Sequence, residues 1–203
     1  MFRRIIDHPF FVFGLLALPL FMVFSLYQSF EPMRPGATVE HALLHPTGET
    51  SVRLLIITMI LTPMRRIFPQ SGFWQWMMKR RRYFGVAAFA YAALHLTFFV
   101  MDEGSVIEIL GSFTKPAMLL GWFAFFVFLP LAITSNDWSV RKLGLRWKRV
   151  QQWVYPAAVA TAVHWVLVSE EIGPALVHFL PLVLLEAYRL YGNWRRQRAR
   201  LAS

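Results

Sequence analysis

The chain has 203 residues, of which 57% are hydrophobic, and its formal net charge is +10 at pH 7. A soluble domain of this length is ordinarily less apolar, so the composition indicates an integral membrane protein. The sequence contains no cysteine, which excludes disulfides, cysteine-ligated zinc, iron–sulfur clusters and the Cys-x-x-Cys-His attachment of c-type haem.

The N-terminal segment, MFRRIIDHPFFVFGLLALPLFMVFSLYQSF, has the order of charged and apolar residues found in a signal peptide. Its apolar run nevertheless continues for about 20 residues, which is long enough to cross a bilayer, and no A-x-A cleavage site follows. We therefore expect residues 10–30 to form the first transmembrane helix.

Apolar segments of similar length recur along the rest of the chain. Each is about 17–25 residues long, the length needed to cross roughly 30 Å of hydrocarbon. Pro116 and Pro174 fall where helices are expected to begin, whereas Arg53 and Pro63 shorten the second segment. The predicted spans are residues 10–30, 51–68, 84–101, 116–134, 152–169 and 173–191. We expect a single all-α transmembrane domain over residues 1–203, a bundle of six helices.

The segments that connect these spans alternate in charge. The N-terminus, the segments after the second and fourth spans, and the C-terminal tail hold most of the lysines and arginines, whereas the other connections are mainly acidic. Because cations concentrate on the cytoplasmic side of membrane proteins, both termini are predicted to be cytoplasmic. Topology and attraction to anionic lipid therefore explain the net charge, and binding of nucleic acid is not expected.

Three of the six histidines, His95, His164 and His178, lie inside predicted spans. Ionisable side chains in a membrane are costly and usually functional, although a single histidine can serve only to hydrogen-bond a neighbouring helix. His95 and His164 each lie about 12 residues into a span that enters from the cytoplasm, so both are roughly 18 Å from the cytoplasmic end. Two neutral imidazoles at one depth can hold one metal from opposite sides, which is the axial arrangement of haem iron.

Small residues near both histidines leave room for a flat macrocycle. Ordinary packing of small residues explains the alanines, but it does not explain two histidines at matched depth. His178 is an alternative ligand, because it lies as close to the outer end of its span as His164 does. We predict His95 and His164 as the ligands. The two helix faces in question are Ala88, Ala92, His95 and Phe99, and Ala157, Thr161, His164 and Val168.

Three segments of the chain carry a resemblance to a known family. They read HPTGETSVRLLIITMILTPMRR, KRRRYFGVAAFAYAALHLTFFV and TSNDWSVRKLGLRWKRVQQWVYPAAVATAVHW. In combination they resemble the MsrQ (YedZ) family, the haem-binding membrane subunits of the periplasmic methionine sulfoxide reductase system, within the ferric-reductase-like transmembrane superfamily. The resemblance extends from about His45 to the sixth span.

This resemblance implies a function and a set of partners. It implies haem b held at His95 and His164, a bound FMN, and electrons drawn from the quinone pool or a cytosolic flavin reductase. It also implies that the electrons pass outward to MsrP, a periplasmic molybdenum enzyme that reduces oxidised methionines in proteins. The chain would then be a redox subunit without catalytic residues of its own, in the bacterial inner membrane.

The same comparison bears on the number of haems. Two-haem members of the superfamily have further ligands 13 residues before the outer ones, and these positions are Arg82 and Gln151 here. Neither is a normal haem ligand, so we expect one haem, on the outer half of the membrane. A flavin would fill the remaining gap on the cytoplasmic half, where cations suit its phosphate, although cytoplasmic cations are expected there in any case. The candidate FMN region is Arg81, Arg82, Arg141, Lys142, Trp147 and Gln151.

His45 lies near the outer end of the second span and is a candidate contact for a quinone headgroup or the periplasmic partner; alternatively it is a water-facing histidine at a helix start. Two rival functions compete with electron transfer to a partner enzyme. A stand-alone reductase of ferric or cupric ions is disfavoured, because the chain has no nicotinamide domain and no G-x-G-x-x-G before a helix. A non-redox transporter is disfavoured because Glu186 is the only deep carboxylate in a predicted span.

Overall fold

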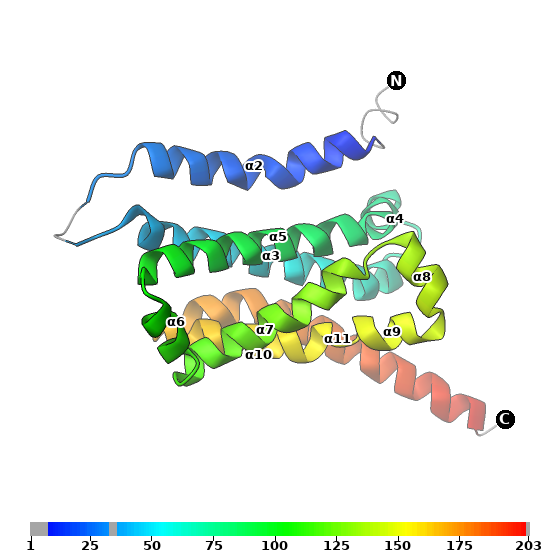
Figure 1. Cartoon of the computed structure of the whole chain (residues 1–203). Coiled ribbons are helices and arrows are strands. Elements are labelled where there is room, and N and C mark those ends of the chain that lie inside the picture. Colours follow the sequence, from blue (N-terminus) through cyan, green and yellow to red (C-terminus); the bar gives the residue numbers. More distant parts are fainter. Residues whose placement is uncertain (1–7, 33–35, 202–203) are drawn as a thin grey trace.

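The computed structural model describes residues 8–32 and 36–201, and all regular structure in these ranges is helical. The helices are α2 (Pro9–Gln28), α3 (Val39–Ile67), α4 (Gly72–Lys79), α5 (Arg81–Glu103), α6 (Val106–Ser112), α7 (Pro116–Ile133), α8 (Asp137–Leu143), α9 (Leu145–Gln151), α10 (Val154–Ser169) and α11 (Ile172–Leu201). The long helices α3, α5, α7, α10 and α11 pack into a bundle, and α2 lies along one edge of it (Figure 1).

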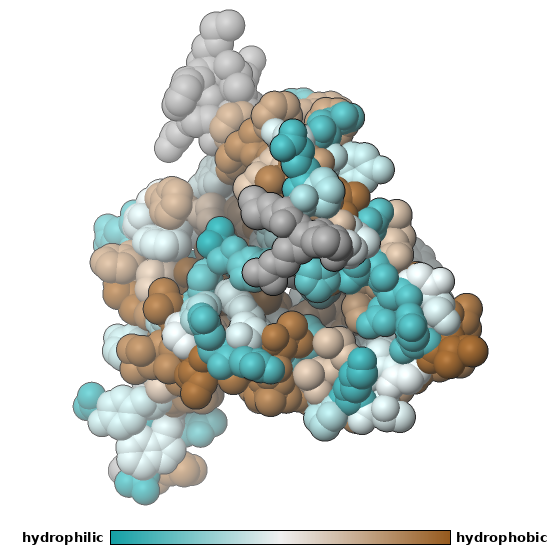
Figure 2. All heavy atoms as spheres, turned by 90° about the vertical axis from the view of Figure 1, so that its left-hand side faces the viewer, coloured by the Kyte–Doolittle hydropathy of each residue, from teal (hydrophilic) through white to brown (hydrophobic). Residues whose placement is uncertain are grey.

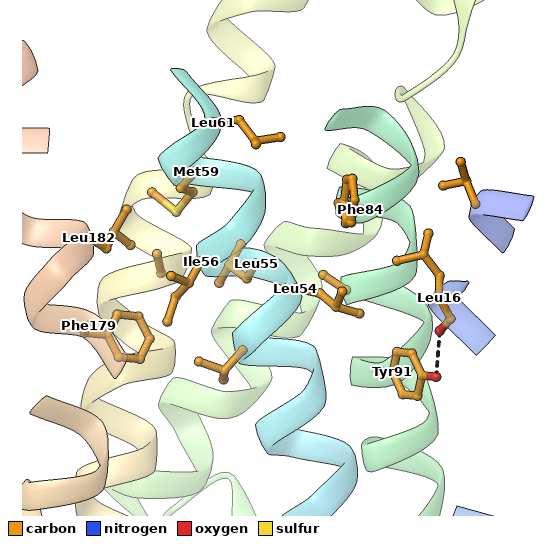
Figure 3. Close-up of a cluster of buried hydrophobic side chains, with 14 residues drawn as sticks. Leu16, Leu54, Leu55, Ile56, Met59, Leu61, Phe84, Tyr91, Phe179 and Leu182 are labelled. Atoms are coloured by element: carbon orange, nitrogen blue, oxygen red, sulfur yellow. Dashed lines mark hydrogen bonds between the residues drawn. The ribbon is translucent and has the colours of Figure 1, made fainter. Parts of the chain in front are cut away.

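The hydrophobic core of the bundle centres on α3, which packs against α5 on one side and α11 on another. Leu55 and Met59 of α3 are buried in one cluster with Phe84 of α5 and Leu182 of α11 (Figure 3). Because α3 is covered on several sides, it tolerates polar side chains that bond within the protein. Ser51, for example, donates from Oγ to the carbonyl of Ala88 on α5 at 2.8 Å.

The outer surface of the bundle is rich in large apolar side chains. Phe21 of α2 is 74% exposed and Val177 of α11 is 73% exposed, which suits contact with lipid rather than water. Within the described residues, four helical segments are long and apolar enough to cross a membrane: Phe10–Gln28, Arg81–Glu103, Pro116–Ile133 and Ile172–Leu201. These four correspond to predicted spans.

The other two predicted spans are helical but differ from the expectation. α3 begins at Val39 rather than near residue 51, because the hydroxyl of Thr38 caps it by accepting a hydrogen bond from the His41 N–H. Charged residues such as Arg53 lower the hydropathy of α3. α10 has only 16 residues and follows α9 after a short turn. Six crossings therefore remain a prediction.

The two ends of the bundle differ in charge. α2 begins and α11 ends at the end where α4, α8 and α9 lie (Figure 1), and these short helices carry cations such as Lys79, Arg141 and Arg149. We call this the basic end. The opposite end, at α6 and the starts of α3 and α7, carries Asp102 and Glu108 and presents many hydrophilic side chains (Figure 2). α11 runs on to Leu201, beyond the predicted end of its span at 191, so the arginine-rich tail continues the helix.

Candidate metal centre

His95 of α5 and His164 of α10 lie next to each other, as their matched depth in the sequence suggested. Their ring centroids are 6.5 Å apart and their planes meet at 80°. Both helices run from the basic end toward the opposite end, and both histidines lie in the second half of their helix. Each comes from a different antiparallel pair, α3 with α5 and α7 with α10, and these are the most closely packed pairs in the bundle.

The hydrogen bonds of the two rings fix their tautomer. Nδ1 of His95 lies 2.9 Å from the carbonyl oxygen of Leu44, and Nδ1 of His164 lies 2.7 Å from that of Ala117. A carbonyl only accepts, so each Nδ1 must carry the proton. In the neutral ring this leaves a lone pair on Nε2, and neither Nε2 has a hydrogen-bond partner within residues 8–32 and 36–201. This is the state in which an imidazole ligates a metal.

A cavity of about 350 Å³ opens beside the two rings, between α3, α5, α7 and α10. Its walls are mostly apolar and aromatic, and its polar residues other than the two histidines lie mainly toward the end opposite the basic one. Among the residues that line it are His45, Gly48, Glu49, Gly121, Trp122 and Trp165. Of the two predicted small-residue faces, Ala92, Phe99, Thr161 and Val168 line the cavity, whereas Ala88 and Ala157 are buried below it.

The residues present fit a haem with two axial histidines. An iron held between two imidazoles at metal–nitrogen distances of about 2 Å places the ring centroids roughly 6 Å apart. The observed 6.5 Å between His95 and His164 agrees with that spacing. The apolar walls suit the porphyrin, and the two Nε2 lone pairs would serve as its axial ligands.

His178, the alternative ligand, is placed differently. It belongs to α11, its Nδ1 bonds the carbonyl of Pro174 at 2.8 Å, and its Nε2 accepts a hydrogen bond from Arg53 Nε at 3.3 Å. Its ring packs on Trp165, with centroids 5.0 Å apart, and it is not among the described residues that line the cavity. Both of its nitrogens are therefore engaged away from His95 and His164.

His45 lines the cavity but does not stand at a helix start, because α3 begins at Val39. Its Nδ1 lies 3.8 Å from the carboxylate of Glu49, and its ring meets Trp165 edge-on. Glu49 also pairs with Arg53 at 2.5 Å and lies 3.6 Å from His178. Sequence reasoning missed this polar group, although Glu49 and Arg53 lie one and two helical turns after His45, a spacing that places all three on one face.

The candidate FMN residues divide into three places. Arg81 turns toward α3, where its Nε donates to the carbonyl of Thr58 at 3.0 Å. Arg82 pairs with Asp137 of α8 at 2.6 Å, and the exposed Arg141 of α8 also acts on that carboxylate. The pKa of Asp137 is lowered, chiefly by the hydrogen bond from Arg82 and then by its charge.

Lys142, also on α8, lies over the ring of Trp138 at 4.5 Å. The last two candidates complete the end of α7. Nε1 of Trp147 donates to the carbonyl of Thr134 at 2.9 Å, and the Gln151 amide donates to the Leu131 carbonyl and the Thr134 hydroxyl, each at 3.1 Å. The structure thus brings Arg82 and Arg141 to one carboxylate, that of Asp137, whereas Lys142 lies over Trp138 on the same helix and Arg81 turns toward α3.

Comparison with known proteins identifies the class to which this site belongs. Residues 47–162 match the family described as the ferric reductase like transmembrane component, a range that includes His95 and ends just before His164. No solved structure matches the chain.

Individual relatives narrow the class further. The chain is 33% identical over 183 residues to the protein-methionine-sulfoxide reductase heme-binding subunit MsrQ of Rhizobium meliloti (strain 1021), an alignment that covers 86% of this chain and 82% of the relative. It is 35% identical over 169 residues to the MsrQ of Brucella melitensis biotype 2 (strain ATCC 23457), covering 81% of this chain and 72% of the relative. The chain therefore belongs to the MsrQ family of heme-binding subunits, within the ferric-reductase-like transmembrane proteins, and the resemblance seen in its three segments is confirmed.

Proposed function

We propose that the chain holds one haem b through His95 and His164 and carries electrons across the bacterial inner membrane as the membrane subunit of a methionine sulfoxide reductase system. One observation carries the proposal: two imidazoles from different helix pairs, with centroids 6.5 Å apart, whose Nδ1 atoms are both committed to backbone carbonyls. The names of the relatives support the haem and the methionine sulfoxide reductase system.

The haem supplies a one-electron carrier that the side chains of this protein lack. The protein residues do the rest. The carbonyls of Leu44 and Ala117 hold the protons of the two rings on Nδ1 and thereby direct both Nε2 lone pairs into the cavity. Aromatic walls such as Trp122 keep water away from the site, which favours electron transfer over side reactions.

The family and the charge distribution support the proposed direction of electron transfer and the proposed partners. The basic end faces the cytoplasm in this account, with both termini there, and the cavity lies toward the periplasm. Electrons enter from the quinone pool or a cytosolic flavin reductase and leave to an MsrP-like molybdenum enzyme. His45 and Glu49, at the polar side of the cavity, are the residues we assign to contact with a quinone headgroup or with that partner.

We also propose that FMN relays electrons on the cytoplasmic half. Arg82, Arg141 and Lys142 support this assignment, because they gather at the basic end and suit a phosphate. Trp147 and Gln151 would border the site rather than bind through their side-chain N–H groups, since these already donate to the end of α7.

The proposed function is tested by reconstitution. The purified chain is reduced with dithionite, excess reductant is removed, and haem reoxidation is followed after addition of an oxidised MsrP-like enzyme with methionine sulfoxide. Fast reoxidation that requires the enzyme, and that exceeds the electrons the enzyme itself can accept only when methionine sulfoxide is present, supports the proposal. If the haem is not reoxidised by the enzyme with methionine sulfoxide but is reoxidised by ferric citrate, the result would instead favour a stand-alone metal reductase. The match to the ferric-reductase-like family is the observation that suggests this second function.

A further inference from the structure

The ring of His95 rests on a helix position without a side chain. Its Nδ1 donates to the carbonyl of Leu44 on α3, and four residues further along α3 is Gly48. A Cβ added at Gly48 would lie 3.0 Å from Nδ1 and 3.1 Å from Cε1 of His95, and its three nearest neighbours would all be atoms of that ring. We call the Leu44 carbonyl together with Gly48 the first cradle.

The ring of His164 is held by the same arrangement on another helix. Its Nδ1 donates to the carbonyl of Ala117 on α7, and four residues further along α7 is Gly121. A Cβ added at Gly121 would lie 2.9 Å from Cε1 and 3.0 Å from Nδ1 of His164. We call the Ala117 carbonyl together with Gly121 the second cradle.

Helix geometry explains why the glycine stands four residues after the carbonyl. In an α-helix the carbonyl of residue i accepts from the N–H of residue i+4, so the side chain of i+4 lies beside that carbonyl on the same face. A second donor, here the imidazole, reaches the carbonyl from that side. A Cβ at i+4 would crowd that path. At Gly121 it would lie 2.9 Å from the ring, a contact that real Cβ atoms essentially never show, and at Gly48 it would lie 3.0 Å from the ring, which would then have to shift by a few tenths of an ångström.

We propose that Gly48 and Gly121 are positioning residues for the two axial imidazoles. Each keeps one face of its helix open, so that the ring on the neighbouring helix can reach the carbonyl of the cradle. The cradle then fixes the tautomer and the rotation of the ring. This inference rests on the proposed haem site, and it adds two residues that do not touch the iron.

The repetition of the cradle is the strongest support for the inference. The two cradles lie on α3 and α7, the first helices of the two closely packed pairs, and each serves a histidine on the second helix of its pair. Packing alone does not require a glycine at the same offset from a bonded carbonyl in both pairs. The cradles hold the two ring planes at 80° to each other, and a haem bound between these rings would meet them in that arrangement.

The first test compares alanine variants of glycines in long helices of the full chain. Gly48→Ala and Gly121→Ala place a Cβ against a ligand ring, whereas Gly85→Ala is the matched control, because its Cβ would meet only Thr58, at an ordinary 3.6 Å. We expect the first two to weaken haem binding about 10- to 100-fold and to change the electron paramagnetic resonance spectrum of the low-spin haem, which reports the angle between the axial ring planes. The control, Gly85→Ala, should keep the haem affinity and the spectrum of the wild-type protein. Unchanged spectra and haem content in the two cradle variants would overturn the proposal.

A second test keeps the proposal open to refutation when a variant folds poorly. In a His95→Ala background the ring is gone, so Gly48→Ala has nothing to displace and should no longer destabilise the haem-free protein. If thermal unfolding shows that Gly48→Ala is as damaging with the ring absent as with it present, Gly48 serves ordinary packing and the proposal is wrong. Wild-type protein that holds no haem would refute the proposed function, while the cycle in haem-free protein would still decide the role of the glycine.

Discussion

The imidazole rings of His95 and His164 lie with their centroids 6.5 Å apart and their planes at 80°, although 69 positions separate the two residues in the chain. Each ring belongs to a different pair of antiparallel helices, so the space between them exists only when the two pairs pack together. A haem bound there would bridge α5 and α10 and add its binding energy to the association of the pairs. Loss of either histidine should therefore affect both haem content and the stability of the bundle.

The predicted topology has a direct test, because the chain has no native cysteine. Thr114→Cys and Glu171→Cys lie at exposed positions at the end opposite the basic one, and Gln70→Cys and Arg146→Cys lie at exposed positions at the basic end. A membrane-impermeant maleimide added to intact cells should label the first two variants and reach the others only after the inner membrane is opened. Labelling of Arg146→Cys in intact cells would refute cytoplasmic placement of the basic end.

Tyr91→Phe should loosen α2 from the bundle. The Tyr91 hydroxyl donates a hydrogen bond to the carbonyl of Leu16 at 2.9 Å and thereby joins α5 to α2 (Figure 3). Its removal should lower the free energy of unfolding in detergent by about 0.5–1.5 kcal/mol. Tyr83→Phe is the control, since Tyr83 packs on Phe13 of α2 through its ring. Equal losses in the two variants would mean that the Tyr91 hydroxyl contributes nothing.

The pKa of Asp137 should depend on Arg82. Because the hydrogen bond and charge of Arg82 lower this pKa in the folded protein, the pair contributes to stability above the unfolded pKa of the carboxyl and loses that contribution as the pH falls through the folded pKa. In Arg82→Gln, carbon-13 NMR of the Asp137 carboxyl should show a pKa closer to its ordinary value. Arg141→Gln should raise the pKa of Asp137 by less than Arg82→Gln does. A larger rise in Arg141→Gln would show that Arg141, and not Arg82, is the main cause of the lowered pKa.

Gln151→His should not create a second haem site. The Gln151 amide caps the end of α7 through Leu131 and Thr134, and the position that would supply the opposite ligand is Arg82, which is paired with Asp137. Haem per chain, measured by pyridine haemochrome, should stay at the wild-type value. An additional haem in this variant would show that another histidine can complete a site on the basic half.

The sequence predicted the long apolar helices well and their polar extensions poorly. α2, α5 and α7 begin and end close to the predicted spans, because hydropathy changes sharply at their ends. The first half of α3 is polar and contains Pro46 and Gly48, so a hydropathy criterion assigns it to a connection. The short helices α4, α6, α8 and α9 have only seven or eight residues each and therefore carry no spanning signal.

The pairing of His95 with His164 could be predicted because depth in a helix follows directly from residue number. What surrounds the rings could not be predicted in this way. Which carbonyl meets Nδ1, and which residue stands beside it, depends on the rotation of α3 against α5 and of α7 against α10. The separation of His178 from the cavity likewise depends on Trp165, a residue that no motif singled out.

The central claim is that His95 and His164 together ligate one haem, and glycine variants of the three intramembrane histidines test it most directly. Haem content and the absorption spectrum are measured for His95→Gly, His164→Gly and His178→Gly, each expressed with and without added imidazole. The account predicts one haem b per wild-type chain, loss of haem in the first two variants with recovery of the low-spin spectrum by imidazole, and an unchanged spectrum in His178→Gly. Retention of haem in His95→Gly together with its loss in His178→Gly would contradict it.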